Sequence, residues 1–335
     1  MRIKEKLGEI GITASARANR FPIPALGYLV GLELVARDVD MTSTDATVWI
    51  EDGGMHLFNR IELFAGPTTI RALSGRAAFY RWKLDHRHKP YYLEGALTDG
   101  DGALDVVIPI ELVTPRSFNP LATALNTKWF GRDGVSLQIT FGAAGDVLSN
   151  ADAAFAAGQV VEVVGIYEES LDKEPKHFRT MEERVKVFDD GANSQESINF
   201  DDIDGLRSVL FISTDAASDK TKDATMGNIG TWRIYGNTLG EGRKRIEETL
   251  AYLAWLNTYH EAGLPEISQD GLLANTIHND PGVWERHWDL YGQLDTLAVR
   301  SKMSNLVIEM TGVNAAADKL FYTTEVIEAI PGMNL

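Results

Sequence analysis

The two halves of the sequence contain similar motifs in the same order, and this repeat constrains the fold more than any other feature. A strand-like run that ends in a glycine turn surrounds Ile61 and again Trp232, and a later strand-like run surrounds Leu137 and again Leu306. The spacing is similar, because 76 residues separate Ile61 from Leu137 and 74 separate Trp232 from Leu306. Self-similarity on this scale predicts two tandem copies of one structural unit.

The apolar runs are mostly short, rich in Val, Ile, Phe and Tyr, and bounded by turn-forming residues, which is typical of β-strands. Strict alternation in Leu137–Phe141 predicts a strand with one buried and one polar face. Each half has enough runs for one jelly roll, so we expect an all-β fold of two tandem eight-stranded jelly-roll β-sandwiches. The expected strands are Gly27–Val35, Thr47–Ile50, Arg60–Phe64, Leu104–Val113, Val135–Phe141, Gln159–Tyr167, Val185–Phe188, Leu206–Ser213, Thr231–Tyr235, Asn305–Met310 and Leu320–Ile330.

Two stretches have helical periodicity instead, and we expect short helical insertions there. The clearer one is Arg243–Ala262, where apolar residues recur at helical spacing and Gly263 and Pro265 provide a stop signal. The second candidate is Leu73–His88.

Composition and charge suggest where the chain divides. Residues 1–20 carry five basic side chains and two acidic ones, the opposite of the whole chain, and we interpret them as an N-terminal arm. Residues 21–170 are expected to form the first jelly roll and residues 185–335 the second. Between them the sequence becomes almost wholly charged around Pro175, which predicts a linker at residues 171–184.

The overall charge excludes several classes of function. A net charge of −16 argues against general binding to nucleic acid, which needs a surface excess of Lys and Arg. The chain has no cysteine, so disulfides and thiolate metal sites are excluded. We also find no apolar run long enough to span a bilayer, no phosphate-binding loop, no nucleophile elbow and no dinucleotide fingerprint.

This layout resembles the double jelly-roll major capsid proteins of tailless icosahedral viruses and bacteriophages, some of which enclose a membrane. The resemblance rests on a polar N-terminal segment, an opening Phe21–Pro24, the paired runs Asn59–Gly66 and Ile229–Asn237, and the closing strands Val160–Tyr167 and Glu325–Ile330. It implies a structural protein that is not an enzyme and that forms homotrimers with a pseudo-hexameric outline, which then tile the shell of a virion.

The same resemblance implies particular partners and a location. The chain would contact copies of itself, neighbouring capsomers and minor and vertex capsid proteins, with no specific nucleic acid. The basic residues 1–20 would suit an internal viral membrane, because cations near anionic head groups are stabilised. We expect synthesis in the host cytoplasm and a place in the virion capsid, and we expect no catalytic, cofactor-binding or metal-binding residues.

Two other classes of protein remain open at this point. His86, His88 and Glu94 have the residue types of a cupin metal site, but they follow a helix-like stretch rich in cations, which opposes metal binding. A carbohydrate-binding or carbohydrate-cleaving β-sandwich would need exposed aromatic side chains, and Trp284 and Trp288 are candidates. These tryptophans suit a subunit interface equally well.

Three further polar groups have simpler interpretations. His278, Asp280 and His287 could bind a metal, although a polar loop explains them as well. The acidic runs Asp189–Gly191 and Asp201–Gly205 do not have the spacing of an EF-hand calcium loop, and turns explain them.

Overall fold

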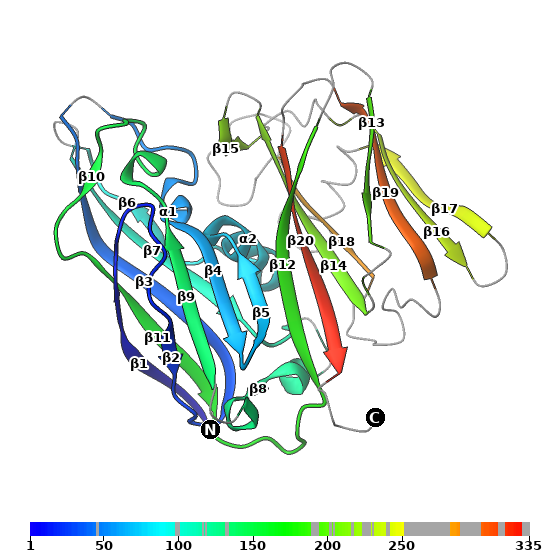
Figure 1. Cartoon of the computed structure of the whole chain (residues 1–335), viewed down its shortest axis with the longest axis horizontal. Coiled ribbons are helices and arrows are strands. Elements are labelled where there is room, and N and C mark those ends of the chain that lie inside the picture. Colours follow the sequence, from blue (N-terminus) through cyan, green and yellow to red (C-terminus); the bar gives the residue numbers. More distant parts are fainter. Residues whose placement is uncertain are drawn as a thin grey trace. The chain divides into compact units, whose positions relative to one another are not determined.

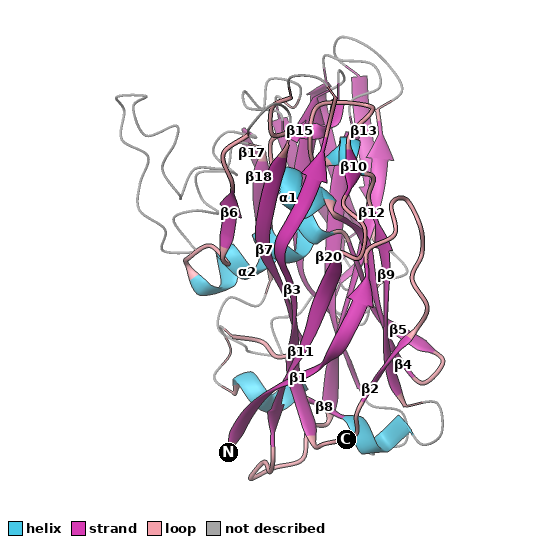
Figure 2. Ribbon diagram, turned by 90° about the vertical axis from the view of Figure 1, so that its left-hand side faces the viewer, coloured by secondary structure: helices cyan, strands magenta, loops and turns pink. Residues whose placement is uncertain are grey.

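The computed structural model contains two compact units, and strands dominate both of them (Figures 1 and 2). Unit 1 contains Met1–Glu182 and Ala329–Leu335, and unit 2 contains Glu183–Glu328. The all-β class is therefore confirmed. The structure describes residues 1–44, 47–97, 101–115, 117, 119–130, 134–188, 194–200, 203, 205–215, 218–222, 229, 231–238, 242–250, 282–288, 303–313 and 319–329.

Unit 1 is built from two sheets. The first sheet has the order β1-β11-β3-β7-β6, with β8 and β10 also paired to β3, and the second has the order β12-β5-β4-β9-β2. The strands of the first sheet are β1 (Arg2–Gly11), β3 (Tyr28–Thr42), β6 (Tyr92–Glu94), β7 (Gly102–Glu111), β8 (Leu125–Asn126), β10 (Ala154–Phe155) and β11 (Val160–Glu168). Those of the second are β2 (Phe21–Ile23), β4 (Phe58–Ala65), β5 (Thr68–Leu73), β9 (Val135–Phe141) and β12 (His177–Val187), whose last residues belong to unit 2.

Alternation places the core between these two sheets. In β9 the side chains of Leu137, Ile139 and Phe141 are fully buried, whereas the intervening residues are partly exposed, as the sequence predicts. Leu34 of β3 and Val163 of β11 form a buried cross-strand pair on the core face of the first sheet. Burial of such side chains is the main stabilising contribution to a sandwich.

The predicted helix at Leu73–His88 is confirmed as α2 (Gly75–His86). Ser74 caps its N-terminus, because its hydroxyl accepts a hydrogen bond from the backbone N–H of Ala77 at 3.1 Å. The helix ends at Arg87, which has a left-handed φ of 62° and donates its backbone N–H to Lys83. The remaining helices of unit 1 are short: α1 (Gly53–His56), η1 (Pro120–Thr123), η2 (Thr127–Phe130) and η3 (Ala144–Asp146).

Unit 2 also contains two sheets. One has the order β15-β14-β20, with β18 also paired to β14, and the other has the order β13-β19-β16-β17. Trp232 of β16 contacts Phe211 of β14 at a ring distance of 4.7 Å and Trp284 of β18 at 5.9 Å, so aromatic rings connect the sheets. The strands are β13 (Ser194–Asn199), β14 (Leu206–Asp215), β15 (Ser218–Lys222), β16 (Thr231–Thr238), β17 (Gly242–Leu250), β18 (Val283–His287), β19 (Met303–Val313) and β20 (Lys319–Ala329).

Several expected elements are wrong. The first part of the helix expected at Arg243–Ala262 is strand β17, which pairs with β16 from Thr238↔Gly242 to Thr231↔Leu250. Only three residues separate Thr238 from Gly242 in the sequence, so β17 has a neighbouring strand with which to pair, and backbone pairing along a whole strand overrides local helical periodicity. Residues 251–262 lie outside the described residues. The strand expected at Thr47–Ile50 is only an isolated bridge between Trp49 and Leu148.

The prediction of an N-terminal arm at residues 1–20 is also wrong. Strand β1 pairs antiparallel with β11 from Arg2↔Glu168 to Gly11↔Val160, and β2 pairs with β9. Residues 1–23, which we call the N-terminal segment, thus contain β1 and β2, and each of these strands lies at the edge of one sheet of unit 1 (Figure 1). Their polar composition fits an edge strand, since Arg2–Lys6 are exposed.

The linker expected at residues 171–184 is shorter than predicted. Its second part begins strand β12, which pairs in parallel with β5 at Met181↔Arg71. Arg179 and Phe178, which lie in this charged stretch, are buried. The contact boundary between the units falls at Glu182 and Glu183, close to the end of the expected linker. Among the described residues, no helix is long and apolar enough to cross a membrane.

Candidate functional site

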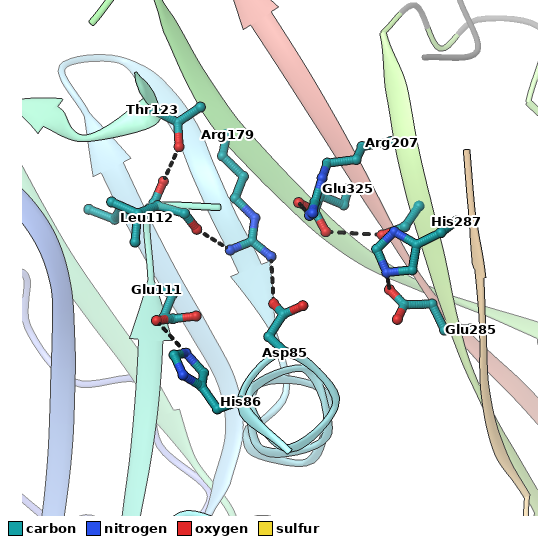
Figure 3. A network of polar contacts seen from close by, with 12 residues as sticks. Asp85, His86, Glu111, Leu112, Thr123, Arg179, Arg207, Glu285, His287 and Glu325 are labelled. Carbon is teal, nitrogen blue, oxygen red and sulfur yellow. Dashed lines mark hydrogen bonds and ion pairs between the residues drawn. The ribbon is translucent and has the colours of Figure 1, made fainter. Parts of the chain in front are cut away.

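The histidine that the sequence singled out at the end of α2 is part of a polar contact with β7. His86 Nε2 lies 2.7 Å from Glu111 Oε1, and the His86 ring stacks on Trp82 with a centroid distance of 3.8 Å (Figure 3). Residues 82 and 86 share a helix face, which explains the stacking. The imidazole is therefore held between an indole ring and a carboxylate.

A groove with a volume of about 300 Å³ lies beside this contact in unit 1. Strands β1, β3, β7 and β11 contribute to it, together with α2 and the loop after β7. It is lined by Arg2, Val30, Gly31, Leu32, Trp82, His86, Pro109, Ile110, Glu111, Val113, Pro115, Pro120 and Ile166. Prolines and aliphatic side chains predominate, so the groove has few groups for acid–base chemistry.

Burial raises the pKa of Glu111 above its ordinary value of 4.5, and the hydrogen bond from His86 offsets part of this effect. Between pH 4.5 and the folded-state pKa, the folded protein therefore holds a proton that the unfolded chain has released. The contribution of the protonated Glu111 carboxyl to the unfolding free energy is therefore fully present below pH 4.5. It is lost as the pH rises through the folded-state pKa.

We therefore expect Glu111→Gln to flatten the decline in unfolding free energy above pH 4.5. Urea titrations at a series of pH values would measure this, with the exposed Glu169→Gln as a matched control that keeps the wild-type slope. If Glu111→Gln retains the full wild-type slope, Glu111 does not contribute to it.

A buried ion pair lies on the other side of α2. Arg179 Nη2 is 3.2 Å from Asp85 Oδ2, and both side chains are fully buried (Figure 3). Arg179 Nη1 also donates to the backbone carbonyl of Val113 at 2.5 Å. Arg71 of β5 donates to the carbonyl oxygen of Glu111 at 2.7 Å and to that of Arg179. These charge-assisted hydrogen bonds connect α2 with β5, β7 and β12.

Unit 2 contains two buried acidic contacts of its own. Arg207 Nη1 is 2.5 Å from Glu325 Oε1, and the hydroxyl of Ser208 donates to Glu325 Oε2 at 3.0 Å. His287 Nε2 lies 2.7 Å from Glu285 Oε1 on β18, with both side chains 2% exposed. Groups this deeply buried are positioned to stabilise the sandwich and are poorly placed to bind a substrate.

The residues of the cupin-like hypothesis do not converge on one point. His88 Nδ1 is 2.9 Å from the backbone oxygen of His86, and Glu94 accepts a hydrogen bond from Tyr92 on β6. Within the described part of the chain, no three His, Asp or Glu side chains form a cluster that could hold a metal. His278, Asp280, the Asp189–Gly191 run and most of Asp201–Gly205 lie outside the described residues.

Of the two tryptophans considered for carbohydrate binding, only Trp288 is accessible to solvent. Trp284 is only 1% exposed and stacks on Phe211 at 5.4 Å, so it belongs to the core of unit 2. Trp288 is partly exposed, with the Arg286 guanidinium 5.9 Å from its ring.

Sequence reasoning missed the buried charges altogether. Arg71, Arg179 and Arg207 each occur in a strand and are at most 1% exposed. An arginine inside an otherwise apolar strand is the signal that could have identified Arg71 and Arg207, because such a residue needs a buried partner. Glu111, which accepts from Arg71, and Glu325, which accepts from Arg207, are 40 and 118 residues away, so these pairings could not be predicted from the sequence.

The two units together define the class of fold as a double jelly roll, which confirms the expectation from the sequence repeat. No protein-family model matches the sequence, and no curated protein matches it. Solved structures do match it in three dimensions.

Three of the solved structures that are similar to the chain are viral proteins. The STIV MCP, from Sulfolobus Turreted Icosahedral Virus, matches with a TM-score of 0.69 at 12% identity, covering 99% of this chain and 97% of that chain. PBCV-1 VP54, fitted into a reconstruction of the virophage Sputnik, gives 0.64 at 12% identity, covering 99% and 96%. The major capsid protein P2 from bacteriophage PM2 gives 0.57 at 9% identity, covering 100% of both chains. The likeness to double jelly-roll capsid proteins is thus confirmed for the fold.

Proposed function

We propose that this chain is a major capsid protein, a structural subunit that associates with copies of itself to form an icosahedral virion shell. The observation that carries the proposal is the match in fold over the whole length of both chains to viral capsid proteins. A domain of a larger enzyme would be expected to match over a part only. The subunit has no catalytic role in this proposal, and its place is the virion, after synthesis in the host cytoplasm.

The edges of unit 1 favour association through side-chain surfaces. Strand β1 has a bulge between Lys6 and Gly8, β2 has three residues and includes Pro22, and β6 also has three residues. Short strands, bulges and edge prolines hinder the addition of a further strand from another molecule. A shell protein with such edges would make defined contacts without forming extended sheets between copies.

The partners follow from this role. We propose a homotrimer with a pseudo-hexameric outline that contacts neighbouring capsomers and minor and vertex capsid proteins. A contact of the N-terminal segment with an internal membrane would use exposed apolar groups such as Met1 and Ile3. Its first cations already form ion pairs within the molecule: Arg2 is 3.0 Å from Glu168 and Lys4 is 2.6 Å from Glu33.

The mass of the purified protein in solution tests this function. Light scattering coupled to size exclusion is expected to give about three times the chain mass of 36.9 kDa, or larger assemblies. A protein that remains monomeric at high concentration and binds glycans tightly would favour the carbohydrate-binding alternative and contradict the capsid role.

A further inference from the structure

We propose that the exposed stretch from Arg87 to Leu93 is a contact surface for a second copy of this chain, and that it binds the acidic turn that follows β11. We call it the Arg87–Leu93 patch, and its side chains are Arg87, His88, Lys89, Tyr91 and Leu93. The inference rests on the proposed function, since it names the surface through which shell subunits would meet.

The patch combines cations with large exposed apolar groups. Arg87, His88 and Lys89 are all exposed, and Tyr91 and Leu93 are 59% and 51% exposed. Arginine and tyrosine are enriched among the residues that dominate binding energy in protein interfaces. The exposed pair Tyr91 and Leu93, next to cations, is therefore more typical of a protein interface than of a solvated loop.

Contacts with the rest of unit 1 anchor both ends of the patch. Tyr92, which points to the opposite side of β6 from Leu93, accepts a hydrogen bond from the Gly54 backbone N–H at 3.1 Å. At the other end, the His88 ring packs edge-on against Trp82 at 6.1 Å. Preorganisation lowers the entropy lost on association, so a fixed patch binds more tightly than a mobile one.

The charge of the patch identifies its occupant. The chain as a whole has a net charge of −16, with 48 acidic and 32 basic residues, so a second copy offers an excess of carboxylates to a cationic surface. Four cations of the N-terminal segment are in ion pairs within the molecule, as in Lys6–Glu162 at 2.8 Å and Arg17–Glu62 at 2.6 Å, and Arg20 lies over the Phe64 ring. The Arg87 guanidinium has no such partner among the described residues and remains available for another molecule.

The acidic turn after β11 is the complementary surface. Glu169 and Asp172 are exposed, and within the described part of the chain neither carboxylate has an ion-pair partner. The patch and the turn are different surfaces of unit 1, so their contact is heterologous: each copy presents the patch to one neighbour and the turn to another. Contacts of this kind form rings or extended lattices, which is what tiling of a shell requires.

Charge exchange tests the contact on the full chain. We expect Arg87→Asp with Lys89→Glu to weaken self-association about tenfold or more, measured by light scattering over a dilution series. Adding Glu169→Lys and Asp172→Lys to the same chain is expected to restore assembly, because both surfaces then carry the opposite sign. Lys128→Glu, at an exposed cation away from the patch, is the matched control and should assemble like the wild type.

A second pair of variants, Tyr91→Ser and Leu93→Ser, tests the apolar part, and circular dichroism confirms that each variant is folded. If the wild type assembles and the patch variants assemble equally well, the patch is not the contact. If the exchanged chain is not restored, the acidic turn is not its occupant. A wild-type protein that stays monomeric at every concentration would overturn the capsid proposal itself and, with it, this inference.

Discussion

Deletion of residues 1–20 is expected to unfold unit 1 instead of releasing a free arm. The deletion removes strand β1, which pairs with β11 over its whole length, and the residues that lead into β2. Ile10, only 7% exposed, would be lost from the core, and the buried Val161 and Val163 of β11 would border a new edge. Because a domain of this size is stable by only about 5–15 kcal/mol, loss of a complete strand should abolish cooperative unfolding.

Urea denaturation followed by circular dichroism measures this effect. The matched control keeps the strand and removes only its charges, through Arg2→Gln, Lys4→Gln and Lys6→Gln. Exposed ion pairs contribute about 0–1 kcal/mol each, so the control should unfold cooperatively with a small shift in midpoint. A truncated chain with the wild-type midpoint and slope would show that the segment is a dispensable arm.

Arg179→Met should be the most destabilising single substitution in the network around α2. It leaves the carboxylate of Asp85 fully buried without its arginine, and it removes the hydrogen bond to the carbonyl oxygen of Val113. Breaking a buried ion pair on one side typically costs about 3–5 kcal/mol of unfolding free energy.

The double substitution Arg179→Met with Asp85→Leu should recover a large part of this loss, since it removes both buried charges. Arg17→Met is the control at a more exposed pair, where Arg17 is 54% exposed, and it should cost about 1 kcal/mol or less. A double variant as unstable as Arg179→Met alone would show that packing of the arginine side chain, and not its charge, is the cause.

Strands that alternate cleanly could be predicted from the sequence. Val135–Phe141 has the predicted bounds in the structure because its apolar residues all face the core. Strand β1 could not be predicted, because an edge strand with both faces exposed at Arg2–Lys6 has no apolar alternation. The sequence of β17 predicts a helix because Ile246 and Leu250 are four residues apart, which is about one helical turn. The same even spacing also puts two residues on one face of a strand, so this pattern does not distinguish the two structures.

The candidate site was less predictable than the fold. The sequence directed attention to His86, and the structure supplies its partner Glu111, which is 25 residues away and on another element. The Arg87–Leu93 patch contains no motif. Its significance depends on exposure, which only the folded chain reveals, and on comparison with paired cations such as Lys6 and Arg17 in the N-terminal segment.

Electron microscopy of the heaviest assemblies formed by the purified chain tests the capsid role most directly. The capsid proposal predicts closed icosahedral shells, or flat arrays of capsomers with a hexagonal outline, in which three copies of the chain account for each capsomer. Density without repeating capsomers, or a preparation that contains only separate single chains, would contradict it.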